Sequence, residues 1–348
     1  MKKKRALPIC ICFIFMICIM SGCKNGTEVN NKTDINKGKL VTFAFVAKEA
    51  QNPYMKKMYD GFQKACKEVG VKPLFMGPKE ANSEMQIEII NKLISEKVSG
   101  IAIAANDANA LQTVLTKAMK SGIKVISLDS PVNAKSRQIH IEQADPEKIG
   151  RGLIQAAYEM VNGNGGIAIL STTAQSANQN LWISWMKKEM KDHPDKYANT
   201  PLITIQYGDD NDEKSEMKTE EILKNRNVKI IIAPTTVGMF AAAKVIQSSN
   251  SDVLLTGLGL PSEMAPYVQN GICPWMYLWN PIDVGYLAAY TMDSLQKGTI
   301  TGVEGDIFEA GTLGQKVVTN DFYGGTEVLL GDPFKFDSTN IDEWKNIY

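Results

Sequence analysis

Short apolar runs alternate with amphipathic helical segments from about residue 40 onward. The first run, LVTFAFVA at 40–47, is rich in residues that favour β-structure and is short enough to be a buried strand. Apolar residues at helical spacing then extend from Met55 to Val69 and predict a helix. The alternation continues through expected strands at 72–76, 100–104 and 124–128. This order predicts a parallel sheet covered by helices on both faces.

The pattern starts again at 166–170, which indicates a second domain of the same kind. GIAIAAND at 100–107 aligns with KIIIAPTT at 229–236, and IKVISLDSP at 123–131 aligns with VLLTGLGLP at 253–261. The two offsets, 129 and 130 residues, agree closely, so we infer an internal repeat. Further strands are expected in this half at 203–207, 229–233, 253–258 and 275–279, and helices at about 179–191 and 212–225, the latter capped by Asp212.

A long tail follows the repeat, with a helical stretch at 282–297 and short apolar runs at 307–310, 315–318 and 328–330. Such a tail indicates that the chain crosses back between the domains and forms a multi-crossing hinge. We expect one lobe from 40–142 with 281–312, and the other from 143–280 with 313–348. The predicted fold class is α/β, with two similar doubly wound parallel-sheet domains.

The first 39 residues have a different character. Lys2 to Arg5 are basic, an apolar run extends to Met20, and Ser21, Gly22 and Cys23 follow. This order describes a secretory signal, and MSGC resembles a bacterial lipobox, whose cysteine is lipidated. The run of about 15–17 apolar residues falls short of the ~20 that an uncleaved membrane span needs. We expect a signal peptide at 1–22, lipidation of Cys23, a flexible tether to 39, and an extracytoplasmic protein anchored to the cell membrane.

Composition narrows the function classes. Lys and Arg total 38, as do Asp and Glu, so the charge gives no reason to expect nucleic-acid binding. Two histidines, His140 and His193, argue against a histidine-based metal or catalytic site. Three of the six cysteines leave with the signal, and Cys66 and Cys273 are expected to be small buried apolar residues. We expect no cofactor and no metal, and we expect the protein to be a monomer.

Polar and aromatic residues follow the expected strands in both halves. Ligands of open parallel sheets bind just outside the carboxyl ends of the strands. These positions and their neighbours include Lys48, Tyr54, Asp107 and Asp129 in the first half, and Asn178, Gln179, Pro234, Thr236, Trp279 and Asn280 in the second. Carboxylates and amides can bond both the lone pairs and the protons of hydroxyl groups, and aromatic faces cover the C–H side of a ring. The set predicts a small polyhydroxylated ligand held between two closing domains.

Some of these residues have a structural alternative. Asn and Asp after strands often form turns or helix caps, which applies to Asp107 and Asn178. Lys48 can equally be a solvated surface lysine, and Trp279 a core residue. The acidic stretch at 209–212 lacks the spacing of a full EF-hand calcium loop, and we interpret it as a polar turn and helix cap.

Several stretches resemble one known family. The lipobox, the two α/β halves, TFAFVAKEAQNPY and SGIKVISLDSP are similar to periplasmic sugar-binding proteins of the ribose-binding class, type I, which serve ABC importers. Within that class, ANQNLWISWMKKEM, KIIIAPTTVGMFAAA, GLPSEMAPYVQNGICPWMYLWN and DPFKFDSTNIDEWKNIY most resemble the Lsr-type autoinducer-2 receptor, with the rhamnose-binding branch next. The resemblance covers residues 40–348 and implies the periplasmic binding protein type I fold and a permease as partner.

The resemblance also implies which residues bind. In that receptor a lysine, two aspartates, a glutamine, a proline carbonyl and an alanine hold the cyclic hydrated signal. The matching positions here are Lys48, Asp129, Asn178, Gln179, Pro234 and Thr236, with aromatic contacts at Tyr54 and Trp279. Asparagine at 178 in place of aspartate removes a charge and adds a donor, and threonine at 236 in place of alanine adds a methyl and a hydroxyl. Such changes can switch the identity of the sugar.

We therefore expect a substrate-binding lipoprotein that captures autoinducer-2, or a related small furanose, for an ABC importer. A rhamnose- or pentose-binding importer component is the alternative with the same fold. An extracellular sugar-cleaving enzyme would need a carboxyl pair, for which Asp107 and Asp129 are candidates. Signalling through a partner sensor without transport is a further alternative. A binding panel that also recovers the ligand unchanged separates transport ligands from substrates.

Overall fold

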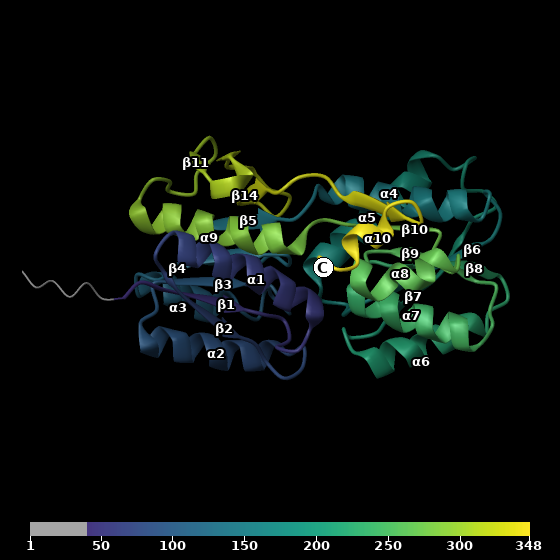
Figure 1. The fold of residues 1–348 in the computed structure, drawn as a ribbon, viewed down its shortest axis with the longest axis horizontal. Helices are drawn as coiled ribbons and strands as arrows, with labels where there is room; N and C mark the ends of the chain where they lie inside the picture. Colours follow the sequence, from purple (N-terminus) through teal and green to yellow (C-terminus); the bar gives the residue numbers. More distant parts are fainter. Residues whose placement is uncertain (1–39) are drawn as a thin grey trace, which may run out of the picture. The chain divides into compact units, whose positions relative to one another are not determined.

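The computed structural model describes residues 40–348. The expected signal peptide, the lipidation of Cys23 and the tether lie outside these residues, so they stay predictions. Within residues 40–348, two sheets with their helices form two lobes, as the alternation of strands and helices predicts (Figure 1). None of the helices in this part of the chain combines the length and the apolar character needed to cross a bilayer.

The first lobe is built on a seven-stranded sheet with the order β13-β14-β5-β4-β3-β1-β2. Neighbouring strands are parallel, except for β13 and β14. The strands are β1 (Thr42–Val46), β2 (Lys72–Met76), β3 (Gly100–Ile103), β4 (Lys124–Leu128), β5 (Ile139–Glu142), β13 (Thr319–Asn320) and β14 (Thr326–Leu329). The helices are α1 (Pro53–Glu68), α2 (Ser83–Glu96), α3 (Gln112–Lys120) and α9 (Pro281–Lys297), with a 3₁₀ turn at Ala134–Ser136.

Alternate residues of β1 face two helical layers. Phe43 and Phe45 pack on the side of α1 and α9, where the ring centroids of Phe45 and Phe62 are 5.6 Å apart. Ala44 and Val46 pack on the other side, against apolar residues of α2 and α3. Figure 1 shows the two helix pairs on opposite faces of the sheet. Because β1 is buried on both faces, its sequence is continuously apolar rather than alternating.

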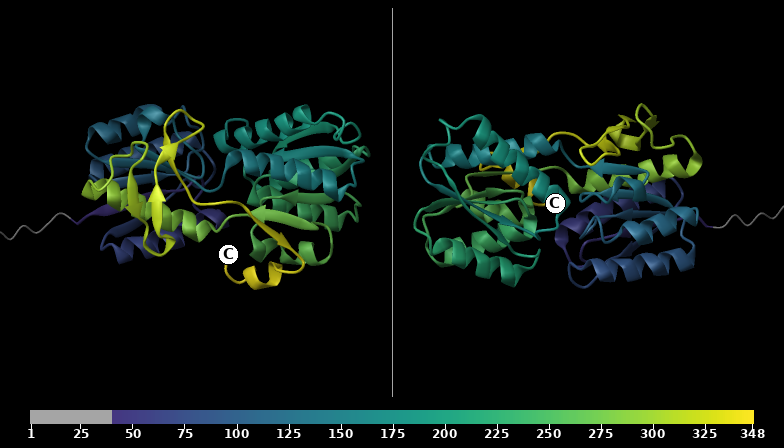
Figure 2. Two further views of the ribbon diagram at one scale, coloured as in Figure 1. Left: turned by 90° about the horizontal axis from the view of Figure 1, so that it is seen from above. Right: turned by 180° about the vertical axis from the view of Figure 1, so that it is seen from behind.

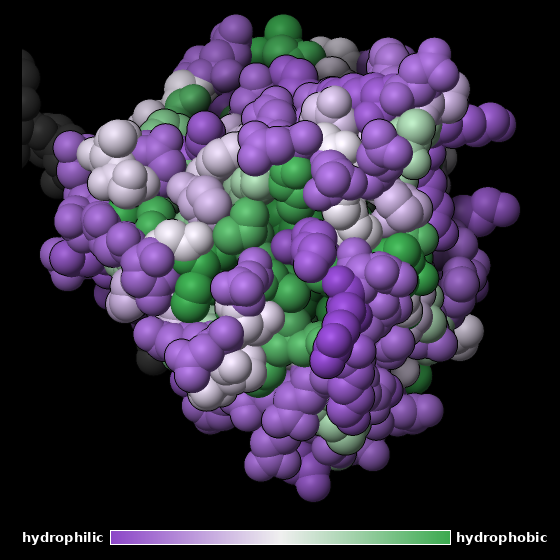
Figure 3. All heavy atoms as spheres, turned by 90° about the vertical axis from the view of Figure 1, so that its right-hand side faces the viewer, coloured by the Kyte–Doolittle hydropathy of each residue, from purple (hydrophilic) through white to green (hydrophobic). Residues whose placement is uncertain are grey.

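The second lobe is built on a four-stranded parallel sheet with the order β7-β6-β8-β9. Its strands are β6 (Gly166–Ser171), β7 (Leu202–Tyr207), β8 (Val228–Ala233) and β9 (Leu254–Gly257). Its helices are α4 (Pro146–Met160), α5 (Ala177–Asp192), α6 (Asp212–Leu223), α7 (Thr236–Ser248), α8 (Pro261–Gln269) and α10 (Ile341–Trp344). Strand β10 (Trp275–Leu278) pairs with β15 (Phe334–Asp337) in antiparallel fashion. Seen from this end, the surface is mostly hydrophilic, with apolar side chains gathered near its middle (Figure 3).

Within residues 40–348 the chain passes between the lobes three times, from β5 to α4, from β10 to α9 and from β14 to β15. Figure 2 shows the last passage from above. The amide of Leu330, where this last passage begins, donates to the carbonyl oxygen of Glu142, the residue of β5 from which the first passage begins, at 2.9 Å. The predicted multi-crossing hinge is confirmed. The expectation that the second lobe resumes at residue 313 differs from the structure. Strand β14 pairs with β5, and β13 pairs with β14, so both strands belong to the sheet of the first lobe.

Helices α1 and α9 approach each other closely because a glycine of each faces the other. A Cβ at Gly61 would lie 1.8 Å from the carbonyl oxygen of Ile282, and a Cβ at Gly285 would lie 1.7 Å from that of Met58. A larger residue at either position would push the helices apart. Helix α9 begins directly after the β10–α9 passage, so its packing on α1 fixes the end of this passage against the first lobe.

Smaller features differ from the sequence-based expectation. The sequence pattern predicts neither strand β5 nor helix α4. The remaining elements are an antiparallel hairpin of β11 (Ile307–Glu309) and β12 (Gln315–Val317), with a 3₁₀ turn at Gly311–Leu313 between them. Asn211, not Asp212, caps α6 by accepting the amide of Lys214 at 2.9 Å. Cys66 and Cys273 are buried, as expected, and burial raises the pKa of the Cys66 thiol to about 12.

Candidate ligand-binding site

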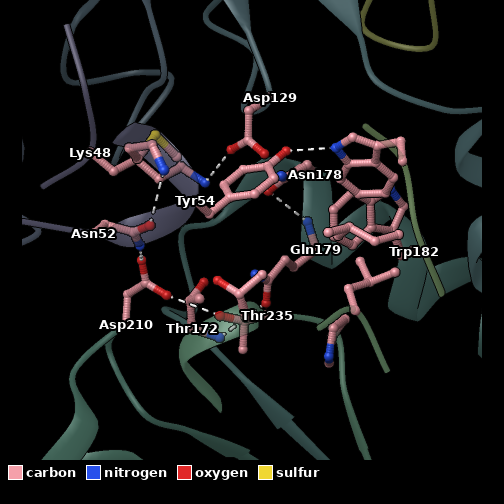
Figure 4. A pocket seen from close by; sticks show the side chains of 16 residues that line it. Lys48, Asn52, Tyr54, Asp129, Thr172, Asn178, Gln179, Trp182, Asp210 and Thr235 are labelled. Carbon is pink, nitrogen blue, oxygen red and sulfur yellow. Dashed lines mark hydrogen bonds and ion pairs between the residues drawn. The ribbon is translucent and has the colours of Figure 1, made fainter. Parts of the chain in front are cut away.

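A small cavity lies between the two lobes (Figure 4). The first lobe contributes Lys48, Asn52, Tyr54, Met55 and Asp129; the second contributes Thr172, Asn178, Gln179, Trp182, Asp210, Pro234, Thr235, Thr236 and Leu258; Leu278 and Trp279 come from β10 and the passage that follows it. Eight of the predicted residues thus gather around one space: Lys48, Tyr54, Asp129, Asn178, Gln179, Pro234, Thr236 and Trp279.

Lys48 and Asp129 form a buried ion pair on the first-lobe side. Lys48 follows β1 and Asp129 follows β4, so both lie at the carboxyl edge of the first sheet. The Lys48 Nζ is 2.8 Å from the Asp129 Oδ2, and the two side chains are 10% and 6% exposed. The backbone of Asp129 has a φ of 61°, in the left-handed region that aspartate tolerates better than most residues. Strain of this kind costs about 1–3 kcal/mol and is typical of positions that must aim a side chain.

Three aromatic side chains form an apolar wall. The Nε1–H of Trp279 donates to the Tyr54 hydroxyl at 2.7 Å, and the two rings meet edge to face with centroids 6.4 Å apart. The Trp182 and Trp279 centroids are 6.0 Å apart. Burial, and then the charge of Asp129, raise the pKa of Tyr54 well above its usual value. The Tyr54 hydroxyl therefore stays protonated, and the wall suits the C–H face of a ring-shaped ligand.

Two amides at the start of α5 line the second-lobe side. The Oδ1 of Asn178 accepts the hydroxyls of Ser130 and Ser176, both at 2.9 Å, and the amide of Gln179, also at 2.9 Å. The Oε1 of Gln179 accepts the Ser171 hydroxyl at 2.6 Å and the Thr172 amide at 3.0 Å. With both oxygens held by protein donors, the NH₂ groups are the parts of these side chains that can donate to a bound molecule.

The sequence-based prediction missed Asn52, Asp210 and Thr235. The Asp210 Oδ1 accepts the Thr235 hydroxyl at 3.0 Å, and its Oδ2 accepts the Asn52 Nδ2–H at 3.1 Å. Burial raises the pKa of Asp210, while the Lys48 charge acts in the opposite direction. The sequence pattern at 209–212 predicts a turn and helix cap and no binding role. These residues nevertheless follow β7, and ligands of parallel sheets bind beyond the carboxyl ends of the strands, so this position is a signal for a binding role.

Two of the predicted ligand-binding residues, Asp107 and Asn280, have other roles in the structure. Asp107 accepts the amides of Asn109 and Ala110, at 2.8 and 3.0 Å, and so stabilises its own turn. Asn280 caps α9 by accepting the amide of Ile282 at 3.0 Å. Neither residue lines the cavity. Asp129 therefore lines the cavity without Asp107, the other member of the carboxyl pair considered for a sugar-cleaving enzyme.

The charged side chains lining the cavity within residues 40–348 are Lys48, Asp129 and Asp210, so the carboxylates outnumber the ammonium by one. Asp209, next in the chain, forms an ion pair with Lys214 instead. Among residues 40–348, no group of three or more His, Cys, Asp or Glu side chains is placed to hold a metal ion. The arrangement suits a ligand that offers hydroxyl groups to both lobes.

Known proteins resemble this chain over nearly all of its described length. The family described as periplasmic binding protein domain matches residues 43–300. A solved structure of an ABC transporter solute-binding protein from Clostridium phytofermentas, with bound L-rhamnose, is 44% identical to this chain, covers 89% of it and 99% of that chain, and has a TM-score of 0.86.

Two further relatives are more distant. The D-allose-binding periplasmic protein of Escherichia coli is 25% identical over 285 residues, which are 78% of this chain and 90% of that protein. A solved structure of LsrB from Clostridium saccharobutylicum in complex with AI-2 is 23% identical, covers 87% of this chain and 99% of that chain, and has a TM-score of 0.82. The latter is a likeness of fold. The family match spans most of the chain and agrees with its two parallel-sheet lobes and crossing hinge, and the chain belongs to the periplasmic binding protein domain family, with the type I fold.

Proposed function

We propose that this protein is the solute-binding component of a sugar ABC importer and that it changes no covalent bond of its ligand. One observation carries the proposal: the two lobes present complementary polar groups to one cavity. The first lobe offers an ammonium and a carboxylate, Lys48 and Asp129, and the second offers amide donors from Asn178 and Gln179. A ring whose hydroxyl groups bond to both lobes stabilises the closed state of the protein, and a permease can recognise that state.

L-Rhamnose, or a closely related sugar, is the ligand we propose first. The support is the 44% identity to a solute-binding protein with bound L-rhamnose over 89% of this chain. The chemistry of the cavity agrees with it, because a 6-deoxy sugar carries a methyl group as well as hydroxyls. Met55, Leu258 and Leu278 give this cavity apolar surface beside its polar groups.

Autoinducer-2, the ligand first expected from the sequence, is the second candidate. The AI-2 complex that resembles this chain is only 23% identical to it. What favours this candidate is that Lys48, Asp129, Gln179 and Pro234, the four positions that match the receptor's pattern, all line the cavity. Asn178 and Thr236 depart from that pattern and also line it.

Calorimetric titration of purified protein starting at Lys24 tests the proposal. The panel is L-rhamnose, D-allose, D-arabinose and autoinducer-2, and each bound ligand is recovered and identified. We expect one sugar to bind about one to one, to be recovered unchanged, and to stabilise the protein by about 2.7 kcal/mol at a concentration 100 times Kd. Gln179→Ala should weaken this binding, whereas Asp107→Ala, outside the cavity, should leave it unchanged. No binding by any of the four, or recovery of a chemically altered ligand, would contradict the proposal.

Anchoring through Cys23 on the outer side of the cell membrane is a separate part of the proposal. It rests on the basic start, the apolar run and the lipobox-like MSGC of the sequence. Fractionation of cells that produce the full chain tests it. We expect the protein in the membrane fraction, and the Cys23→Ser variant to leave that fraction or to keep its signal peptide. An identical distribution and mass of the two proteins would argue against lipidation.

A further inference from the structure

A hydrogen bond joins the two lobes beside the cavity. The Asn52 Nδ2–H of the first lobe donates to the Asp210 Oδ2 of the second at 3.1 Å, across 158 residues of sequence. Both residues line the cavity, and Figure 4 shows them meeting at its lower left. The bond exists only while the lobes are together, since its two ends belong to different sheets.

Each partner is held in place by its own lobe. Asn52 caps α1, because its Oδ1 accepts the amide of Met55 at 3.1 Å. This fixes the amide orientation and leaves the Nδ2 to reach the other lobe. The Oδ1 of Asp210 accepts the Thr235 hydroxyl at 3.0 Å, which leaves its Oδ2 to face Asn52. The two groups are therefore preorganised, so that little side-chain entropy is lost when they meet.

The loop that carries Asp210 is held in an uncommon conformation. Asp209 and Asp210 are consecutive non-glycine residues in the left-handed region, with φ of 53° and 54°. The loop is fastened to the end of β6 through the amides of Gly208 and Asp209, which donate to Ser171 and Thr172 carbonyl oxygens at 2.8 and 3.0 Å. Backbone strain that the surrounding structure maintains in this way is typical of functional sites.

We propose that Asn52 and Asp210 form a clasp that holds the lobes closed, and that Asp210 acts as a positioning residue through this closure rather than by recognising one sugar. The inference rests on the proposed function, in which a ligand enters between the lobes. Opening replaces the clasp with bonds to water. A variant that weakens the clasp lowers the closed fraction, and this lowers the apparent affinity for every ligand by the same factor.

The test measures affinity and dissociation rate for L-rhamnose and for L-mannose, which differs from it by one hydroxyl. Asn52→Ser keeps a good helix cap and removes the amide donor; Asp210→Gly removes the acceptor and tolerates the φ of 54°. Asp209→Gly, in the same loop and at a φ of 53° but outside the cavity, is the matched control. We expect each clasp variant to weaken both sugars equally, by roughly tenfold, mainly through faster dissociation. The double variant should lose no more than either single variant, and the control should match the wild type.

Unequal losses for the two sugars would mean that Asp210 contacts the ligand and would overturn the proposal, as would unchanged affinity or additive losses in the double variant. If only one of the sugars binds, the double variant decides. Failure of the wild type to bind any sugar would count against the proposed function instead. In that case small-angle X-ray scattering of the unliganded proteins tests the clasp: Asp210→Gly is expected to have a larger radius of gyration than Asp209→Gly, and equal radii would overturn it.

Discussion

Replacing Lys48 by Met tests how much the ion pair between Lys48 and Asp129 stabilises the folded protein. Methionine approximates the length of the lysine side chain but carries no charge, so the Asp129 carboxylate loses the cation that lies 2.8 Å away. Removing one partner of a buried pair costs about 3–5 kcal/mol, because the remaining charge is left without compensation. The two side chains are 10% and 6% exposed and face a cavity, so we expect a loss of about 3 kcal/mol in the free energy of unfolding.

Urea unfolding of four proteins measures this: wild type, Lys48→Met, Asp129→Asn and the double variant. Asparagine is the appropriate replacement at 129 because it tolerates the φ of 61° that an alanine would not. The double variant leaves no buried charge at either position. We therefore expect it to recover most of the stability lost in the Lys48→Met variant, with a coupling energy of about 1–3 kcal/mol between the two sites.

A double variant as unstable as the sum of its two single changes would refute the reasoning, because it would show that the two charges do not stabilise each other in the folded protein.

Three further outcomes follow from particular contacts. Asn178→Asp should weaken L-rhamnose binding by roughly tenfold in calorimetry, because the change removes an amide donor and adds a carboxylate to a cavity that already holds two; Asp107→Asn, outside the cavity, should have no effect. Gly285→Ala should lower the melting temperature by several degrees, since its Cβ would lie 1.7 Å from a backbone oxygen, whereas Gly152→Ala in α4, where a Cβ meets nothing within 4 Å, should not lower it. Burial, and then the charge of Asp321, raise the pKa of Glu327 to about 7, above its unfolded value of about 4.3. The folded state therefore holds this proton more tightly, and wild-type stability should fall relative to Glu327→Gln as the pH rises from 4.5 to 7; parallel unfolding curves of the two proteins across this window would contradict it.

The fold was accessible from the sequence because its strands are buried on both faces. Strands of that kind leave short continuous apolar runs, and the runs at 40–47 and 229–233 correspond to β1 and β8. Strand β5, IHIE, was missed because its sequence alternates polar and apolar residues although all four residues are buried. Its polar side chains pack within the lobe, where the His140 Nδ1 and the Ser127 hydroxyl are 2.9 Å apart. A run of apolar residues cannot reveal a strand whose buried side chains are polar.

A residue of the candidate site could be predicted from the sequence where it directly follows a strand that the sequence also predicts. Lys48, Asp129 and Pro234 are of this kind. Asp107 also follows a strand and still lies outside the cavity, because its carboxylate is occupied by two amides of its own turn. The sequence alone cannot separate these outcomes, since a turn-forming aspartate and a ligand-binding aspartate occupy the same place in the pattern.

Asn178 illustrates what only the three-dimensional contacts explain. An amide and a carboxylate have nearly the same shape, so the departure from aspartate at 178 could mean little. In the structure, however, the Asn178 oxygen already accepts three hydrogen bonds, one of them from Ser130 in the other lobe. The second polar atom is what the ligand meets, and asparagine makes it a donor. An aspartate would place a third carboxylate opposite the Lys48 ammonium, beside Asp129 and Asp210. Asparagine therefore keeps the excess of negative charge at one while turning an acceptor into a donor, which favours a ligand whose oxygen faces α5 with a lone pair.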